Sequence, residues 1–208
     1  MPPKRSEPPK EQWQEAKAWV LAQGYKAAAR HGKIGKGGFG TVYLAESLED
    51  GSVAAVRFSS SWDRRQVARE VATLAMLQKH PHGNVLRCYA FETFGGLQMA
   101  QISPCALDDL LAWLEKRAVQ APAARALGRD ACAGLAHLHS LKILHRDIKP
   151  ANMLIFTQPQ FHLQLSDFGT TRPVPEARRQ QAMTPSVAPC LQANSTRIVY
   201  CSSSYIYF

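Results

Sequence analysis

Residues 145 to 152 read His-Arg-Asp-Ile-Lys-Pro-Ala-Asn, and the tripeptide Asp-Phe-Gly follows at positions 167 to 169. These stretches supply two carboxylates, Asp147 and Asp167, and one amide, Asn152, at spacings that suit magnesium-assisted phosphoryl transfer. In that chemistry one carboxylate orients a hydroxyl group, while the other carboxylate and the amide bind the metal ion. Either stretch alone is an ordinary turn sequence, so two unrelated turns are the alternative interpretation.

Apolar segments flank the first stretch on both sides. Ile143 and Leu144 precede it, and residues 153 to 156, Met-Leu-Ile-Phe, follow it with a strand-like pattern. We therefore expect the polar residues to lie on a loop between two buried anchors. His145 and Phe168 are predicted to pack in the core and to hold the two turns in register, without a catalytic role.

A spaced-glycine stretch, Gly-Lys-Gly-Gly-Phe-Gly-Thr-Val, occupies residues 35 to 42. Because glycine has no Cβ atom, its backbone can approach anionic phosphates closely. A Rossmann dinucleotide site also contains spaced glycines, but it requires a helix that begins at the last glycine and an acid on the next strand. Residues 41 to 44, Thr-Val-Tyr-Leu, read instead as a continuing strand, which favours a hairpin.

With the glycine stretch placed before the two turns, the chain resembles the eukaryotic-type protein kinase family, serine/threonine type. The resemblance implies an α+β, bilobal fold with an antiparallel-sheet small lobe and a helical large lobe. It also implies ATP and Mg²⁺ as cofactors and a protein hydroxyl group as acceptor. The sequence around residues 139 to 141, His-Ser-Leu, and 165 to 167, Leu-Ser-Asp, has a weaker likeness to the kinase half of the unfolded-protein-response sensor kinase–endoribonuclease.

The resemblance assigns a role to each motif residue. Asp147 would be the base, Lys149 would offer a charge to the transferring phosphate, and Asn152 and Asp167 would bind magnesium. The expected nucleotide-binding residues belong to the glycine stretch, the strand after it and the segment between the lobes: Ile34, Gly35, Lys36, Gly37, Gly38, Phe39, Gly40, Val42, Arg57 and Ser103. Ala100 is expected as a small residue behind the adenine, with an alignment that can shift by one position.

Arg57 departs from the family pattern, because the family carries a lysine there. A guanidinium group is longer and planar, and it cannot replace a compact ammonium group at the phosphates. The apolar residues between positions 61 and 80 recur at helical spacing, and Glu70 falls on their face. We expect Glu70 to pair with Arg57, although it could instead reach solvent. Lys33 or Lys36 is the alternative source of the missing ammonium.

Composition excludes several classes of protein. The chain has 208 residues, is 46% hydrophobic and carries a formal net charge of +9, but its basic residues are scattered and no basic run alternates with aromatics. We therefore expect no nucleic-acid partner. The five cysteines are an odd number without metal-ligand spacing or a secretory leader, which favours a reducing, cytoplasmic location. The sequence contains no run of 18 apolar residues, so we expect no membrane span.

The expected organisation has five segments. Residues 1–10 are a disordered basic tail, and 11–29 form an extra helix whose apolar face packs on the small lobe or meets a partner. Residues 30–102 form the small lobe, 103–190 a partial large lobe with helices over 107–114 and 123–140, and 191–208 a tail outside the family. Residues 184 to 190 resemble the end of an activation segment. Beyond them a premature end is favoured over a tail that folds back.

Three functions remain open at this level. The first is a serine/threonine kinase domain, truncated in its large lobe. The second is a pseudokinase in which Arg57 holds Glu70 and no phosphate is transferred. The third is an interaction fragment that binds a partner kinase or scaffold through exposed large-lobe surface. The residues that could themselves accept phosphate, with Arg146 as the charge partner, are Thr170, Thr171, Thr184 and Ser186.

Overall fold

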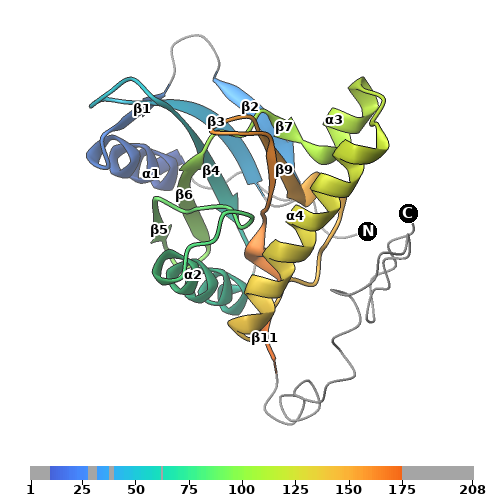
Figure 1. Ribbon diagram of the computed structural model, residues 1–208. Helices are drawn as coiled ribbons and strands as arrows, with labels where there is room; N and C mark the ends of the chain where they lie inside the picture. Colours follow the sequence, from blue (N-terminus) through green and yellow to red (C-terminus); the bar gives the residue numbers. More distant parts are fainter. Residues whose placement is uncertain (1–9, 28–31, 38–39, 62, 175–208) are drawn as a thin grey trace, which may run out of the picture.

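The computed structural model describes residues 10–27, 32–37, 40–61 and 63–174. They form an antiparallel sheet with one helix on each face, followed by a second part in which two helices pack against short strands (Figure 1). This arrangement confirms the predicted α+β, bilobal fold. No helix among these residues is both long and apolar enough to cross a membrane.

The sheet of the first part has six strands. Its order is β1-β3-β4-β6-β5, with β2 paired to β3, and every pairing is antiparallel. The strands are β1 (Tyr25–Ala27), β2 (Lys33–Gly37), β3 (Gly40–Ser47), β4 (Val53–Ser60), β5 (Ala90–Phe94) and β6 (Gln98–Pro104). The small-lobe sheet therefore includes residues 25–27 and 103–104, beyond the predicted limits of 30 and 102.

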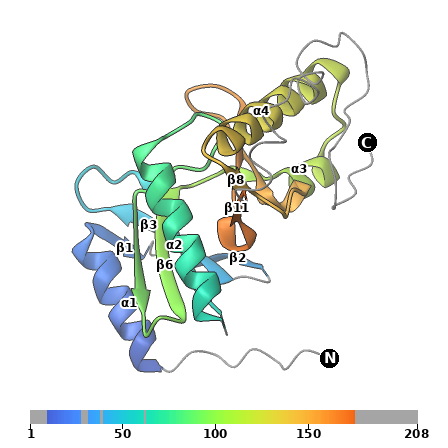
Figure 2. The same ribbon diagram turned by 90° about the horizontal axis from the view of Figure 1, so that it is seen from below.

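Helix α1 (Lys10–Ala22) covers one face of the sheet (Figure 2). Ala16 and Val20 are buried there with Val56 and Ile102, and the Trp19 ring contacts Phe94 edge-on at 6.4 Å. The sequence left open whether this helix packs on the small lobe or meets a partner, and the structure places it on the lobe.

The predicted end of this helix at residue 29 was wrong. The chain turns at Gly24, which has a φ of 82°, and continues as β1. A left-handed φ directly after a helix is favourable for glycine, which ends the helix without steric cost. The helix also begins one residue earlier than expected, at Lys10.

Helix α2 (Arg64–Lys79) lies on the opposite face of the sheet (Figure 2). It begins after Asp63, whose carboxylate accepts a hydrogen bond from the Arg65 amide at 2.8 Å and satisfies a helix N-terminal donor. Its buried face carries the predicted apolar residues Val67, Leu74 and Leu77, together with Glu70. The helix therefore presents one buried acid to the centre of the molecule.

The second part contains α3 (Leu110–Lys116) and α4 (Ala121–Ser140). The helix predicted to start at 107 starts at Leu110, because Asp109 caps it by accepting from the Ala112 amide. The short strands are β7 (Asp108–Asp109), β8 (Ile143–Leu144), β9 (Met153–Phe156), β10 (His162–Leu165) and β11 (Arg172–Pro173). They form two antiparallel sheets, β10-β9-β7 and β11-β8.

One hydrophobic core runs across both parts. It joins Leu74 and Leu77 of α2 to Leu138 of α4 and to Leu163 and Leu165 of β10. A close approach occurs at Gly134 of α4, where a Cβ atom would lie 2.5 Å from the carbonyl oxygen of Asn84. Glycine at this position lets the segment that follows α2 pack directly against α4.

Several predictions fall on residues outside the described ranges. They are the tail at 1–9, the loop positions Gly38 and Phe39, the phosphate acceptors Thr184 and Ser186, the end of the activation segment and the segment 191–208.

Candidate nucleotide and phosphoryl-transfer site

The loop at residues 145–152 brings three predicted polar residues together. Lys149 Nζ donates to Asp147 Oδ2 at 2.7 Å, and Asn152 Nδ2 donates to Asp147 Oδ2 at 2.9 Å and to its backbone oxygen at 2.8 Å. Burial raises the pKa of Asp147, but these hydrogen bonds outweigh it and hold the pKa below its ordinary value. Asp147 is therefore an ionised acceptor at neutral pH.

Buried contacts fix this loop against the Asp-Phe-Gly turn. His145 is 2% exposed, its Nε2 lies 2.9 Å from the Ser166 carbonyl oxygen, and its ring contacts the Phe168 ring edge-on at 5.7 Å. The Ser166 amide donates to the Asn152 carbonyl at 2.9 Å. These contacts confirm that His145 and Phe168 have a packing role and join the two turns.

The turn itself positions Asp167 in a left-handed conformation, with φ 64° and ψ 80°. Its Oδ1 accepts weakly from the Gly169 amide at 3.4 Å. Carboxylate and amide oxygens are the ligands that Mg²⁺ prefers. Asn152 uses its NH₂ group toward Asp147, so its amide oxygen is not used in those bonds, and the donor types of Asn152 and Asp167 fit a magnesium ion.

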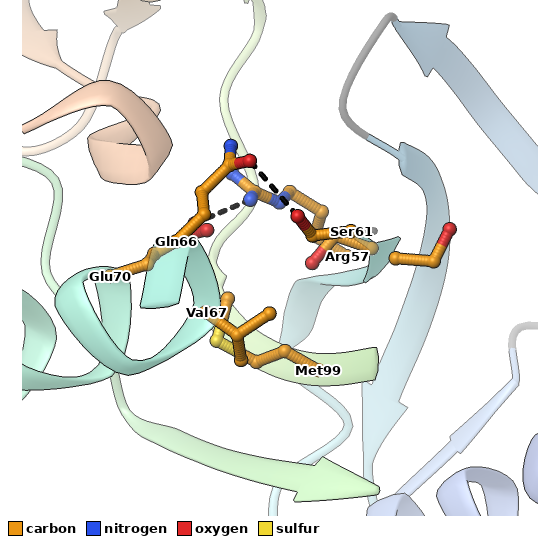
Figure 3. Close-up of a pocket in the computed structure, with 8 residues that line it drawn as sticks. Arg57, Ser61, Gln66, Val67, Glu70 and Met99 are labelled. Carbon is orange, nitrogen blue, oxygen red and sulfur yellow. Dashed lines mark hydrogen bonds and ion pairs between the residues drawn. The ribbon is translucent and has the colours of Figure 1, made fainter. Parts of the chain in front are cut away.

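Arg57 reaches from β4 to two acids at once. Its Nη2 donates to Glu70 Oε1 at 2.5 Å (Figure 3), and its Nη1 lies 3.4 Å from Asp167 Oδ1. The side chains of Arg57 and Glu70 are 17% and 8% exposed, so the predicted pair is present and mostly buried. The contact with Asp167 was not predicted.

Electrostatics favour the charged form of this arginine. Burial alone would lower the pKa of Arg57, but attraction to Glu70 and Asp167 outweighs it and raises the pKa above its ordinary value. Burial raises the pKa of Glu70, and Arg57 offsets only part of that effect. The guanidinium group is thus a fixed positive charge between two acids.

One donor of Arg57 stays unsatisfied. Its Nε is buried and has no hydrogen-bond partner. Beside it is a small pocket lined by β4 and α2, in which Ser61 Oγ and Gln66 Oε1 form a hydrogen bond of 2.9 Å (Figure 3). A lysine has no Nε–H group, so this uncompensated donor is a specific cost of arginine at position 57.

The glycine stretch forms a β2–β3 hairpin, as predicted. Lys36 pairs with Thr41 and Gly37 with Gly40, and the chain continues as a strand through Ser47. A helix after the last glycine, which a Rossmann site requires, is absent from the described residues 40–47. A Cβ atom at Gly40 would lie 2.3 Å from the Phe58 carbonyl oxygen, so only glycine lets β3 approach β4 there.

The expectation for Ala100 was wrong by one position. Ala100 is fully buried and belongs to the α1-side core, whereas Gln101 pairs with Arg57 across β4 and β6. Directly paired residues share a face of the sheet, so the residue on the Arg57 side is Gln101. Ser103 also lies on that side of the sheet, where it is paired with Ala55. Pro104, which follows it, has no backbone N–H group that could donate a hydrogen bond to a nucleotide base.

Comparisons with known proteins agree with this arrangement. The family model "Protein kinase domain" matches residues 28–191. The chain belongs to the protein kinase family.

Individual relatives are serine/threonine kinases. The chain is 36% identical over 163 residues to serine/threonine-protein kinase bur1 of Emericella nidulans, covering 72% of this chain and 29% of that protein. It is 33% identical over 141 residues to serine/threonine-protein kinase 1 of Arabidopsis thaliana, covering 66% and 16%. It is 31% identical over 171 residues to the serine/threonine-protein kinase/endoribonuclease IRE1 of Oryza sativa subsp. japonica, covering 73% and 18%. The chain thus spans less than a third of each of these relatives, and the predicted likeness to the sensor kinase–endoribonuclease is confirmed.

Two of the expected phosphate acceptors use their hydroxyl groups in hydrogen bonds to the backbone. Thr171 is 1% exposed and its hydroxyl group donates to the Phe168 carbonyl at 2.7 Å. The Thr170 hydroxyl donates to the His145 carbonyl at 2.9 Å. In this conformation both threonines brace the turn, and Thr171 is inaccessible to a phosphate donor.

Arginines gather beside the same turn. Burial, followed by the charges of Arg69 and Arg146, lowers the pKa of Arg172. Arg146 is exposed. Of these arginines only Arg146 was predicted from the sequence: Arg172 directly follows Thr171, whereas Arg69 comes from the distant helix α2.

Proposed function

We propose that this chain binds ATP with a magnesium ion and transfers the terminal phosphoryl group to a serine or threonine hydroxyl group of a protein. The observation that supports this most is the bridge from Glu70 through Arg57 to Asp167, which brings β4, α2 and the Asp-Phe-Gly turn into contact. Phosphoryl transfer depends on such positioning more than on covalent chemistry.

Each residue has a role in this proposal. Asp147 accepts the hydrogen bond of the substrate hydroxyl group and takes its proton as transfer proceeds. Lys149 places positive charge beside Asp147, where the phosphate becomes negatively charged. Asn152 and Asp167 hold the magnesium ion, which neutralises phosphate charge when it is bound.

The nucleotide would lie under the β2–β3 hairpin. The glycine backbone of the stretch 35 to 40 would contact the phosphates, with Ile34 and Val42 against the base and Ser103 at its edge. Ile34 is 47% exposed, as expected of a side chain that a ligand would cover. Gly38, Phe39 and the Lys36 side chain belong to the proposal through the family resemblance alone.

Phosphate transfer to a generic protein acceptor tests the proposal. The native chain is compared with Asp147→Asn. The matched control is Asp108→Asn, because Asp108 is an acid outside the site that accepts a hydrogen bond from Lys116. We expect Asp147→Asn to lower transfer by about 10² to 10⁴ and Asp108→Asn to leave it unchanged. Equal transfer by all three proteins would show that Asp147 is not the base and would overturn the assignment.

A second function is favoured by one specific observation. Arg57 stands where the family carries lysine, and its Nη1 contacts the proposed metal ligand Asp167. In a nucleotide-binding module that transfers no phosphate, the contact between Arg57 and Asp167 would hold α2 against the Asp-Phe-Gly turn. Nucleotide-dependent stabilisation with no transfer by the native chain, and transfer gained in Arg57→Lys, would identify this second function.

The acceptor protein is the one partner that the proposed reaction requires. A partner kinase or scaffold at the large-lobe surface, the absence of nucleic acid, and a cytoplasmic location stay predictions of the sequence.

A further inference from the structure

Two threonine hydroxyl groups meet in the core between α2 and the Asp-Phe-Gly turn. Thr73 Oγ1 and Thr171 Oγ1 are 2.8 Å apart, and the two residues are 8% and 1% exposed. Thr73 follows Glu70 by one helical turn, and Thr171 lies two residues after Gly169, the last residue of the Asp-Phe-Gly turn. A second contact therefore joins the elements that Arg57 already joins through charge.

The two hydroxyl groups have two protons for three contacts, and either oxygen could donate in the contact between them. The Thr171 hydroxyl group donates to the Phe168 carbonyl at 2.7 Å, which uses its only proton. Thr73 Oγ1 lies 2.8 Å from Thr171 Oγ1 and 3.0 Å from the Arg69 carbonyl oxygen, so its single proton is shared between these two acceptors while Thr171 donates to Phe168. The result is a chain of hydrogen bonds from α2 through both hydroxyl groups to the backbone of Phe168.

This chain of bonds contains no charged group, unlike the bridge through Arg57. A cation at Asp167 would compete with Arg57 for the same carboxylate, and the contact between Arg57 Nη1 and Asp167 Oδ1 is already long at 3.4 Å. The hydroxyl groups would not take part in that competition. They hold the turn where Gly169 fits closely, since a Cβ atom there would lie 3.3 Å from Glu70 Oε2.

We propose that Thr73 and Thr171 are positioning residues that keep the metal-binding turn against α2 when Asp167 exchanges Arg57 for magnesium. This inference rests on the proposed nucleotide and magnesium function. It predicts that loss of one hydroxyl group weakens the magnesium-dependent part of nucleotide binding and leaves metal-free binding unchanged.

The substitutions needed are mild. Thr171→Val keeps the side-chain shape, and the Phe168 carbonyl still accepts from the Thr171 amide at 3.1 Å. Thr73→Val leaves Thr171 bonded to Phe168. Neither change creates an unpaired buried acceptor, so both variants should fold. Thr171→Ser restores the hydroxyl group and is the rescue variant, and Thr93→Val on β5 is the matched control away from the turn.

The first readout is the Mg²⁺ concentration that half-maximally enhances binding of a fluorescent ATP analogue. We expect an increase of about two- to tenfold in Thr73→Val and Thr171→Val, which corresponds to one hydrogen bond. The double variant should match either single variant, because both remove the same link. Thr171→Ser and Thr93→Val should match the native chain, and affinity in EDTA should be equal in all variants.

The second readout needs no ligand. Hydrogen exchange of the amides of Gly169 and Thr171 should be faster in both valine variants of the link and unchanged in Thr93→Val. Native-like exchange and native-like magnesium dependence in Thr171→Val would overturn the inference. A native chain that binds no nucleotide at any magnesium concentration would overturn the proposed function, and with it the magnesium role of the pair; faster exchange would then assign the pair a structural role only.

Discussion

The Arg57 guanidinium group contacts Asp167 as well as Glu70: its Nη1 lies 3.4 Å from Asp167 Oδ1, across 110 residues of sequence. The residue that replaces the family lysine is therefore bonded to the acid that we assign to magnesium. A planar group with several donors can span two acids, whereas an ammonium group acts as a single point charge.

Replacing this arginine tests whether the contact limits the chain. Arg57→Lys removes the unsatisfied Nε–H group and the reach to Asp167, and we expect it to raise phosphate transfer by about 10², the scale of a misplacement of about 1 Å. The measurement is transfer to a generic protein acceptor at saturating Mg·ATP, beside Arg57→Ala as the variant without charge. No gain in the lysine variant would show that Arg57 is not what limits activity.

Glu70 should matter for stability because its partner is buried. Glu70→Ala leaves the Arg57 guanidinium group with only the long contact to Asp167, and we expect a loss of about 3 kcal/mol in the free energy of unfolding. The matched control is Glu46→Ala, which breaks the exposed 3.6 Å pair with Lys26 and should cost less than about 1 kcal/mol. Denaturant unfolding of the three proteins gives both values, and equal losses would argue against a buried pair.

Lys149 should set the acidic limit of activity. Its hydrogen bond to Asp147 Oδ2 contributes to the lowered pKa of that carboxyl group, so Lys149→Met should raise the pKa of Asp147. A base must be ionised, and the acidic limb of the pH–rate profile should therefore move to higher pH. An unchanged acidic limb would show that Lys149 does not influence the titration of the base. The control is Lys116→Met, which removes a lysine outside the site.

Two glycines of one motif should respond differently to alanine. A Cβ atom at Gly40 would lie 2.3 Å from the Phe58 carbonyl oxygen, whereas one at Gly35 would meet only the Val42 Cβ at 4.0 Å. We expect Gly40→Ala to destabilise the chain by about 1 to 3 kcal/mol and Gly35→Ala by clearly less. Thermal melts without ligand check this, and similar melting temperatures would contradict the close approach of β3 and β4.

Acid should destabilise the chain through His82. Its Nδ1 accepts from the Asn84 amide at 3.1 Å, its ring stacks on His137 at 4.7 Å, and burial followed by the His137 charge lowers its pKa below 6.5. The unfolded chain then binds more protons than the folded one, so stability falls as pH drops below about 6.5.

Melts at pH 7.5 and 5.5 test this expectation. His82→Phe keeps a stacked ring that cannot be protonated, and its melting temperature should depend less on pH than that of the native chain. His80→Gln is the control, because His80 contributes a backbone oxygen to His137 and its side chain is exposed. An unchanged pH dependence in His82→Phe would rule out His82 as the titrating group.

Local features of the chain could be predicted from the sequence because they depend on neighbouring residues. The hairpin at residues 33–47, the amphipathic α2 and the buried segments around the loop at residues 145–152 follow from short-range periodicity and glycine placement. Boundaries were less certain: α1 ends at Ala22, shortly before the left-handed Gly24, although the sequence pattern stays helical beyond this point. The pair Arg57–Glu70 followed from an acid on an apolar helix face, since such a group needs a partner.

Contacts between distant segments were decided only by the tertiary structure. The sequence by itself determined the family, the sheet and the residue types of the site. It did not reveal that Arg57 reaches Asp167, or that Thr73 meets Thr171 across 98 residues, because no local pattern records which side chains two packed segments bring together. It also could not decide between Ala100 and Gln101, since side chains alternate along a strand and a shift of one residue exchanges its two faces.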